Sequence, residues 1–517
     1  MHRRTLTVGS VLALLAGLVI GTTTPSNATA PPNSPDAARA AAIDAADRAV
    51  TGASSGLATS PGERYRRGMV TPWLDNLYSI AYTRTYRGLP VVGGDAAVLA
   101  DGTGRVRAVE SADGPRVIDV PTEPTLPAAT AEASARTRLT AVDRVDAPRL
   151  VVQLGPDAAH LAWETVLAGR IGNAPSRLHV FVDARTGAVL DDATFDDVRA
   201  GTGHSKWNGP DPITITTASS GSTYFMNDLT RPGLTCSKYN GAVLTKTVDD
   251  WGNANPTSIE TGCVDAMWAV QKEWDMLRDW LGRGGHNGAG RTFPVVVGLP
   301  QVNAYFDGTK VIIGHDNRGQ WLGAMDIVGH EYGHLVDSTS PGYPFKAYGL
   351  SEGTGDIFGA LTEFYANEPP PFDTPDYTVG EMVDFGGGPL RHMYNPSLTG
   401  DPNCYSSTLP PDEHKASGPL NHWFYLLAEG SNPGGGKPNS PTCNGSTVTG
   451  VGIKTAGRVF YGGLMGRPAG TNYPKLRMIT VRAAKLLDPT CVAWKATRDA
   501  WSAVGIPVQP GEPSSCP

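Results

Sequence analysis

The chain has 517 residues, more than one hydrophobic core usually supports, so we expect several segments. Its formal net charge is -7, and no block of Lys or Arg interrupts it, which argues against nucleic acid or an anionic membrane surface as a partner. The 62 Gly and 42 Pro, together with only 18% charged residues, favour a loop-rich extracellular protein.

The N-terminus has the pattern of a secretory signal peptide. Basic residues at positions 2–4 precede an apolar run over residues 8–20, and Ala28 and Ala30 then form a small-residue cleavage site. The run is shorter than the roughly 20 apolar residues that cross a bilayer, and no later segment is apolar enough to do so. We therefore expect residues 1–30 to be removed and the protein to be secreted.

The cysteines also indicate an exported protein. All six lie beyond residue 200, and an even number confined to one part of a secreted chain predicts three disulfides. The sequential pairing closes only short local loops, and we favour it over the other pairings that six cysteines allow. The bonds it predicts are Cys236–Cys263, Cys404–Cys443 and Cys491–Cys516.

The 170 or so residues after the signal peptide change from a polar, Ala-rich stretch to strand-like runs. Residues 31 to about 60 are rich in Ala, Pro, Ser and Asp, which predicts a mobile leader with one Ala-rich helix. From residue 80 onward, period-two apolar runs separated by Gly-containing turns predict a small sheet. After a Pro-rich break at residues 121–127, we expect an Ala-rich helix and further strands.

The rest of the chain changes from strand patterns to helix patterns. Residues 200 to about 320 contain strands and turns, one amphipathic helix at residues 265–282 and a strand pair in VNAYFDGTKVIIG. Beyond residue 320, apolar residues recur at three- and four-residue spacing, which predicts mostly helices. The fold class is therefore α+β, with a β-rich lobe meeting an α-helical lobe, and a cleft between lobes favours ligand binding.

The helix expected at the junction of the lobes carries the sequence HEYGH at residues 330–334. On a helix, His330 and His334 share one face and can bind one Zn²⁺, while Glu331 projects beside them toward a bound water. The alternative is a helix with two ordinary histidines. Gly329 and Gly333 would each destabilise this helix by about 1 kcal/mol relative to Ala, so we expect another segment to pack closely against it.

A second predicted helix supplies two more acidic groups. Glu352 stands in SEGTGDIFG, and Asp356 follows one turn later on the same face. One carboxylate can then bind the metal while the other accepts a hydrogen bond from a ligand imidazole. Two histidines and one glutamate leave a fourth position open for water, which is typical of a catalytic zinc site rather than a structural one.

The segments HEYGH, GLSEGTGDIFGALTEFYAN, LRHMYNP and HKASGPLNHWFYLL, in this order, resemble the thermolysin family of metallopeptidases over most of residues 200–517. Upstream, TYRGLPVVGGDAAVLADGTG and FVDARTGAVLDD look like the propeptide of that family, which assists folding and inhibits the enzyme until it is removed. The alternative is a sheet-forming accessory domain. The resemblance implies an endopeptidase made as a zymogen, inhibited by its own propeptide, acting on peptides or proteins and monomeric when mature.

The same resemblance divides the chain into a propeptide and a two-lobed thermolysin-like catalytic part. Residues 31–199 are expected to be the propeptide, with the junction near Arg199. Residues 200–350 form the β-rich lobe with the HExxH helix, and residues 351–517 form the α-helical lobe.

The resemblance also implies roles for the site residues. His330, His334 and Glu352 bind zinc, Glu331 polarises the attacking water, and Asp356 supports a ligand histidine. One departure concerns the residue before the third ligand, Ser351, because the family usually has Asn there to orient the second histidine. That hydrogen bond is expected to be weaker or to come from another group.

A histidine and a tyrosine of the family stabilise the oxyanion of the tetrahedral intermediate. The histidine corresponds to His414, in HKASGPLN, where a cationic imidazole opposes the charge on the carbonyl oxygen. For the tyrosine we favour Tyr343, with Tyr348 as the alternative. The acidic partner of the histidine is left open, because only Asp412 and Glu413 are near and both lie closer to it than is usual.

Substrate is expected to lie as an extended chain along the edge of the predicted strand pair. The family analogues that bind its main chain are Asn303, through its amide, Ala304, through its carbonyl, and Arg391, whose guanidinium suits a substrate carbonyl. An apolar pocket beside the metal predicts cleavage before Leu, Phe or similar residues. Its expected walls are Ile327, Val379 and Leu390.

Acidic residues outside the zinc site predict a calcium site. By the resemblance, Asp326, Glu363, Asp376 and Glu381 hold Ca²⁺ behind the active-site helix, and several carboxylate oxygens suit this ion. Thr378 stands where the two-calcium form of the family has Glu, so we expect one ion. The alternative is a solvated acidic loop.

Two alternative interpretations are a different peptidase family and a protein without catalytic activity. A fungalysin-type peptidase also combines HExxH with a distal Glu, but the SEGTGDIFG and HKASGPLN segments argue against it. A non-catalytic binding protein on a peptidase scaffold would normally have lost a metal ligand or Glu331, and none is lost.

Overall fold

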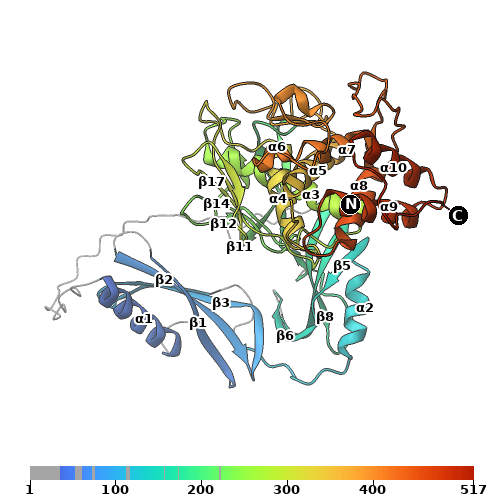
Figure 1. The fold of residues 1–517 in the computed structure, drawn as a ribbon. Coiled ribbons are helices and arrows are strands. Elements are labelled where there is room, and N and C mark those ends of the chain that lie inside the picture. Colours follow the sequence, from blue (N-terminus) through green and yellow to red (C-terminus); the bar gives the residue numbers. More distant parts are fainter. Residues whose placement is uncertain are drawn as a thin grey trace. The chain divides into compact units, whose positions relative to one another are not determined.

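The computed structural model describes residues 35–517, apart from 53–56, 58–60, 73–75, 112–116, 156–157, 173, 192, 221–222, 348 and 517. The predicted signal peptide lies outside the described residues. The chain forms two compact units (Figure 1). The first comprises Met1–Ala131, Arg149–Glu164 and Phe181–Ala193, and the second comprises Glu132–Pro148, Thr165–Val180 and Thr194–Pro517.

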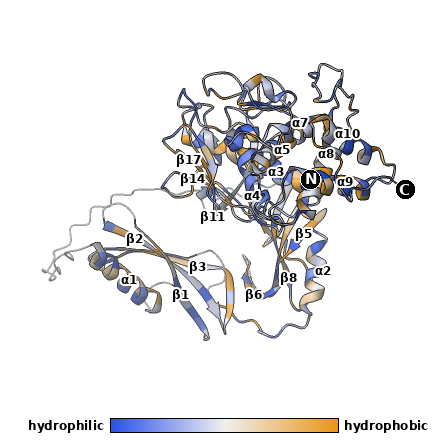
Figure 2. Cartoon of the chain, viewed as in Figure 1, coloured by the Kyte–Doolittle hydropathy of each residue, from blue (hydrophilic) through white to orange (hydrophobic). Residues whose placement is uncertain are grey.

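The first unit begins with a helix that packs against a sheet. Helix α1 (Pro35–Thr51) buries its alanines, including Ala42 and Ala46, among residues of β2 and β3. Figure 2 shows hydrophilic and hydrophobic residues alternating along it. The predicted Ala-rich helix is confirmed, but it packs against the sheet and is not part of a mobile leader, because a row of small side chains lets it lie close to the strands. The strands are β1 (Glu63–Pro72), β2 (Leu77–Tyr86), β3 (Leu89–Asp101) and β4 (Val106–Ser111), all paired antiparallel.

The predicted second helix and further strands follow. They are α2 (Ala128–Arg136), β5 (Ala141–Val145), β6 (Arg149–Leu154), β7 (Ala159–Ile171), β8 (Ala174–Asp183) and β9 (Phe195–Asp196). Strand β6 pairs parallel with β3 and antiparallel with β7, and β5 also pairs antiparallel with β7. Small apolar clusters, such as Val151, Ala162 and Phe181, stabilise these pairings.

From residue 198 the second unit contains mixed sheets. One has the order β15-β12-β11-β10-β16 and another the order β13-β14-β17-β19-β18, in which β18 forms an edge beside β19. The predicted junction at Arg199 falls inside β10, which pairs with β11. The bounds are β10 (Val198–His204), β11 (Ile213–Ser220), β12 (Thr223–Phe225), β13 (Asn227–Asp228), β14 (Leu234–Lys238), β15 (Thr245–Lys246), β16 (Asp250–Gly252), β17 (Val295–Val297), β18 (Ala304–Phe306), β19 (Val311–Ile313), β20 (Thr378–Val379) and β21 (Arg391–His392).

Helices dominate the chain after residue 324, and they share one large apolar core with the preceding strands and α3. Helix α3 begins where the Ser258 hydroxyl accepts a hydrogen bond from the Thr261 amide, and it ends at Gly282 with a positive φ of 68°. The bounds are α3 (Ile259–Leu281), α4 (Met325–Ser338), α5 (Gly349–Ala366), η2 (Pro396–Thr399), α6 (Glu413–Ala416), α7 (Gly418–Ala428), α8 (Ile453–Gly466), α9 (Tyr473–Leu487) and α10 (Val492–Ala503).

The disulfides follow the sequential pattern. Bonds join Cys236 to Cys263, Cys404 to Cys443 and Cys491 to Cys516, which confirms the predicted pairing. Within the described part of the chain, no helix is both long enough and apolar enough to cross a membrane.

Candidate metal centre and active-site cleft

Two closely packed helices, α4 and α5, carry the predicted metal ligands (Figure 1). A Cβ atom on Gly333 would lie 2.9 Å from the Cα of Gly355, and one on Gly329 would lie 3.0 Å from the Cα of Gly359. Real Cβ atoms do not approach this closely, so the glycines on both helices allow the contact. The expectation that another segment packs against the HEYGH helix is confirmed.

The three predicted ligands come together in this contact. The Nε2 atoms of His330 and His334 lie 3.4 and 3.5 Å from the two carboxylate oxygens of Glu352. One ligand atom from each residue lies within 4.8 Å of the others. Among the described residues, Glu352 Oε2 has no hydrogen-bond partner although it is buried. This buried oxygen lies 3.4 Å from Nε2 of His330 and from Nε2 of His414 without a hydrogen bond, and the arrangement of carboxylate and imidazoles fits a metal cation.

Asp356 fixes the orientation of the first histidine. Its Oδ1 lies 2.8 Å from Nδ1 of His330, which leaves Nε2 of that ring for the metal. Arg391 donates two hydrogen bonds to Asp356, at 2.7 and 2.6 Å, and Asn421 donates a third at 2.7 Å. Burial opposes ionisation, but the Arg391 and His330 interactions outweigh it and lower the pKa of Asp356 well below its usual value.

The second histidine has a different support. Nδ1 of His334 lies 3.5 Å from the hydroxyl of Ser351, and that hydroxyl donates a hydrogen bond of 2.7 Å to Asp337. Ser351, which stands where the family usually has Asn, is thus hydrogen-bonded to a buried carboxylate, that of Asp337.

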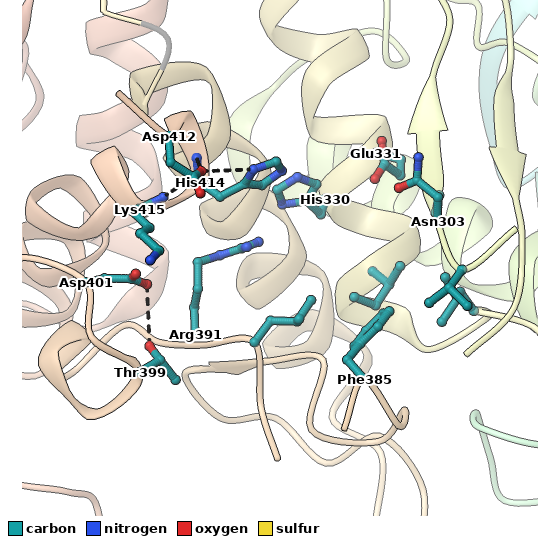
Figure 3. Close-up of a pocket in the computed structure, with 15 residues that line it drawn as sticks. Asn303, His330, Glu331, Phe385, Arg391, Thr399, Asp401, Asp412, His414 and Lys415 are labelled. Atoms are coloured by element: carbon teal, nitrogen blue, oxygen red, sulfur yellow. Dashed lines mark hydrogen bonds and ion pairs between the residues drawn. The ribbon is translucent and has the colours of Figure 1, made fainter. Parts of the chain in front are cut away.

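A cleft of about 420 Å³ opens beside the ligands (Figure 3). In Figure 3, Glu331 and Asn303 lie on one side of it and His414 on the other, with His330 between them. Burial raises the pKa of Glu331, while the charge on His330 opposes the shift. The lining residues are Val302, Asn303, Ala304, Leu322, Ile327, His330, Glu331, Phe385, Leu390, Arg391, Thr399, Asp401, Asp412, His414 and Lys415.

Most of the residues predicted to contact substrate line this cleft, but two do not. Val379 is only 2% exposed and is absent from the lining, because its side chain packs into the large apolar core, whereas Leu390 lines the cleft. Tyr343 is 51% exposed and also does not line the cleft. The alternative, Tyr348, lies outside the described residues.

Asp412 is an acidic neighbour of the His414 ring. Asp412 Oδ1 lies 3.4 Å from Nδ1 of His414. The same carboxylate accepts a hydrogen bond of 3.0 Å from the backbone amide of His414 at the start of α6. Both contacts come from a residue only two positions upstream of His414.

Phe385 and Leu322 also line the cleft, and the sequence analysis missed both. Phe385 follows Asp384, whose carboxylate accepts a hydrogen bond of 2.8 Å from Arg318 and whose carbonyl accepts one of 2.9 Å from the Asn317 amide. The available signal in the sequence was a large apolar residue, Phe385, in a loop between an aspartate and three glycines (VDFGGG).

Buried carboxylates form a second cluster behind α4. Asp326, Glu363 and Asp373 each place one oxygen within 4.8 Å of the others. Both oxygens of Glu363 and one of Asp373 are buried without a hydrogen-bond partner among the described residues. Burial and mutual repulsion raise the pKa values of all three well above normal. Asp373 was not predicted, although it stands three positions before Asp376 in the same acidic loop.

The other two predicted calcium ligands lie beside this cluster. Charges on Glu381 and Asp376 act on Asp326, and Glu381 shares a hydrogen bond with Asp373. Thr378 donates hydrogen bonds to Asp376 at 2.6 Å and to Glu381 at 3.1 Å. Two of the four predicted residues, Asp326 and Glu363, thus lie in the cluster itself, and Asp376 and Glu381 are its neighbours.

Two family descriptions match adjoining parts of this region. Residues 200–338 match the catalytic domain of thermolysin metallopeptidases, and residues 342–506 match their alpha-helical domain. The chain belongs to the thermolysin metallopeptidase family. This assignment agrees with the predicted two-lobed fold and argues against a fungalysin-type peptidase.

Individual relatives cover different shares of the chain. The transglutaminase-activating metalloprotease of Streptomyces mobaraensis is 37% identical over 451 residues, covering 82% of this chain and 59% of that protein. The chain thus spans less than two thirds of that relative. The thermostable neutral protease NprT of Geobacillus stearothermophilus is 29% identical over 392 residues, which cover 69% of this chain and 68% of that protein. A solved structure, the protealysin precursor from Serratia proteamaculans, aligns with a TM-score of 0.39 at 20% identity. The alignment covers 53% of this chain and 85% of that structure.

Proposed function

We propose that this chain is a secreted zinc-dependent endopeptidase made as a zymogen. The observation that carries the proposal is the convergence of His330, His334 and Glu352 beside a cleft that also exposes Glu331 and His414. These residues belong to a thermolysin-family catalytic region, and members of that family are zinc-dependent.

The donor set suits zinc better than a purely oxygen-binding cation. Two imidazoles and one carboxylate are typical ligands of catalytic zinc sites, which keep one position open. When bound, zinc would act as a Lewis acid and lower the pKa of a coordinated water. The hydrogen bond from His330 Nδ1 to Asp356 leaves Nε2 directed at the ligand site, as such a role requires.

Glu331 is suited to move protons during peptide hydrolysis. Its carboxylate takes a proton from the attacking water and delivers it to the leaving amine. Its buried position beside the ligands supports this role, because burial brings the pKa of a carboxyl closer to neutrality.

His414 stands across the cleft from Glu331 and can oppose charge on the scissile carbonyl oxygen. Asp412 orients its ring through Nδ1, which leaves Nε2 to face the cleft. Tyr343 has no comparable support, since it is half exposed and does not line the cleft.

Substrate recognition combines main-chain contacts with apolar burial. The edge strand β18 can pair with an extended peptide, while Asn303 and Arg391 offer an amide and a guanidinium beside it. Ile327, Leu390 and Phe385 give the cleft an apolar wall, which favours cleavage before large apolar residues such as Leu or Phe.

The carboxylate cluster behind α4 is proposed to bind calcium. The unpartnered buried oxygens of Glu363 and Asp373 fit a cation that takes 6–8 oxygen ligands. Asp326, Glu381 and Asp376 would complete the set of oxygen ligands. Thr378 stands where the two-calcium form of the family has Glu, and this favours one ion over two. Bound calcium would neutralise charges that otherwise repel one another.

Residues 1–30 are proposed to direct secretion and residues 31–199 to act as an inhibitory propeptide. The absence of cysteine before residue 200 supports a region that is discarded, while all three disulfides lie in the part that would remain. The junction would then lie near Arg199, although pairing of β10 with β11 favours a cut just before this strand.

The test is peptidase activity of the secreted, processed protein against an unstructured protein substrate. Activity should disappear on zinc chelation and return when zinc is added. A processed protein that retains stoichiometric zinc but hydrolyses no peptide bond would instead support a binding protein on a peptidase scaffold.

A further inference from the structure

We propose that Ser351, Asp337 and Arg467 form a positioning relay that holds the second ligand histidine, His334, in its metal-binding orientation. The proposal rests on the zinc site described above and extends it to residues without an assigned role. None of the three would touch substrate, so they are positioning residues rather than catalytic ones.

The relay is a chain of hydrogen bonds that starts at the histidine ring. Nδ1 of His334 lies 3.5 Å from the Ser351 hydroxyl, which donates a hydrogen bond of 2.7 Å to Oδ2 of Asp337. An ionised carboxylate can only accept, so the hydroxyl proton points to Asp337. The hydroxyl oxygen is then free to accept from His334 Nδ1–H, which leaves the Nε2 lone pair for the metal.

The carboxylate end of the relay is held by a buried ion pair. Arg467 contacts Oδ1 of Asp337, and both side chains are fully buried. Arg467 also donates hydrogen bonds of 2.8 Å to the Asp337 carbonyl and 2.7 Å to the Pro341 carbonyl. Its guanidinium lies 4.0 Å from the centroid of the Phe345 ring. So many fixed contacts leave Asp337 one orientation, toward Ser351.

The two ligand histidines therefore have parallel supports. His330 reaches a buried Asp–Arg pair directly, through Asp356 and Arg391. His334 reaches the pair Asp337–Arg467 through one interposed hydroxyl. The Ser351 side chain is shorter than the Asn usual in the family, so by itself it is a weaker acceptor for the His334 ring. The Asp337 carboxylate compensates by polarising the Ser351 hydroxyl.

This relay joins segments that are far apart in the sequence. Asp337 lies in the last turn of helix α4, Ser351 lies in the first turn of helix α5, and Arg467 follows helix α8, 130 positions after Asp337. Because the same relay ties these helices together, it couples the geometry of the ligand site to the packing of the helical lobe.

The experiment compares zinc release from four forms of the full-length chain: wild type, S351A, S351N and S338A. Zinc-loaded protein is mixed with excess chromogenic chelator, and the melting temperature of each metal-free form is measured separately. Ser338 is the matched control, because its hydroxyl bonds to the Leu335 carbonyl on the same helix and not to a ligand.

We expect S351A to release zinc about 10-fold faster than wild type, the lower end of the effect of removing a support of a metal ligand. The S351N form should behave nearly like wild type, since its amide oxygen can accept from His334 and its NH₂ can donate to Asp337. S338A should release zinc at the wild-type rate. Metal-free S351A should still show one cooperative melting transition, so that its faster zinc release reflects the ligand site and not loss of the fold.

Three results would overturn the relay. These are unchanged zinc release by S351A, equally fast release by S338A, or release by S351N as fast as by S351A. A wild-type chain that binds no zinc would refute the relay together with the proposed metal centre. Fast release by S351A from a zinc-loaded chain whose processed form proves to have no peptidase activity would support the relay and refute only the proposed function.

Discussion

Nε2 of His414 lies 3.4 Å from Oε2 of Glu352, although the two residues come from different helices, α6 and α5. The imidazole of His414 is 59% exposed, and its other nitrogen, Nδ1, lies 3.4 Å from Oδ1 of Asp412. His414 therefore reaches the edge of the ligand site without belonging to it. A group in this position can contact a substrate carbonyl without being needed to hold the metal.

This arrangement predicts the outcome of H414A. Turnover should fall about 100-fold, as is typical when one donor to an oxyanion is removed, while zinc content stays unchanged. The effect should appear mainly in kcat rather than KM, because the donor acts on charge that develops in the transition state. Steady-state kinetics with a peptide substrate, together with metal analysis, provide the check. An unchanged kcat would remove His414 from the mechanism.

E331Q should have a larger effect than H414A. Gln has nearly the shape of Glu but cannot accept the proton of the attacking water, so kcat should fall about 10³- to 10⁴-fold. Circular dichroism and zinc content should match wild type, since Glu331 is not a ligand. E413Q, which changes an exposed carboxylate beside His414, is the control and should retain most activity. Near-normal hydrolysis by zinc-loaded E331Q would contradict the proposed mechanism.

The ligand geometry could be predicted because it depends on helix periodicity. His330 and His334 share a face at four-residue spacing, and Asp356 follows Glu352 by one turn, so local sequence places each pair. The glycines of α4 signalled a close neighbour for the same reason, since they weaken a helix unless they permit a contact. The sequential disulfides were also local.

Contacts between distant segments could not be predicted in the same way. Arg467 pairs with Asp337 across 130 positions, and no spacing in the sequence relates the two residues. Val379 and Leu390 are both apolar, but the pairing of β20 with β21 decides which of them faces the cleft. Asp373 joins the carboxylate cluster through the path of its loop, which composition does not determine.

The carboxylate cluster predicts that calcium stabilises the enzyme. At a free calcium concentration of 100 times the Kd, binding to the native state alone adds about 2.7 kcal/mol. The melting temperature should therefore rise with calcium and fall when calcium is removed while zinc is retained. The gain should be larger at alkaline than at acidic pH, because burial and mutual repulsion raise the pKa values of Asp326, Glu363 and Asp373 and protons compete with the ion.

A matched pair of variants separates this site from other acidic groups. E363Q should abolish most of the calcium-dependent rise, because both oxygens of Glu363 are buried without a partner among the described residues and one of them lies in the cluster. D307N, in the turn between β18 and β19, should keep the rise even if it lowers the melting temperature overall. A melting temperature that ignores calcium, or metal analysis that returns zinc alone, would show that the cluster binds no calcium.

The last prediction concerns a buried ion pair near the C-terminus. Arg477 is fully buried and donates hydrogen bonds of 2.7 and 2.8 Å to Glu512, and Arg498 donates another of 3.0 Å. Burial favours the neutral acid, but the hydrogen bonds outweigh it and lower the pKa of Glu512. E512Q leaves the Arg477 charge without its counterion and should reduce the free energy of unfolding by about 3 kcal/mol at neutral pH.

The pH dependence of that loss follows from the direction of the pKa shift. A carboxyl with a lowered folded pKa stabilises the native state above its unfolded pKa of 4.5, and this contribution disappears as pH falls through the folded value. The difference between wild type and E512Q, measured by urea denaturation, should therefore be full at pH about 7 and shrink below pH about 4. The control is D499N, which removes the exposed pair of Asp499 with Lys495 on α10 and should cost no more than about 0.5 kcal/mol. Two results would show that the ion pair does not stabilise this end of the chain through charge. One is a loss of unfolding free energy in E512Q as small as that in D499N at neutral pH, and the other is a loss that stays constant down to pH about 3.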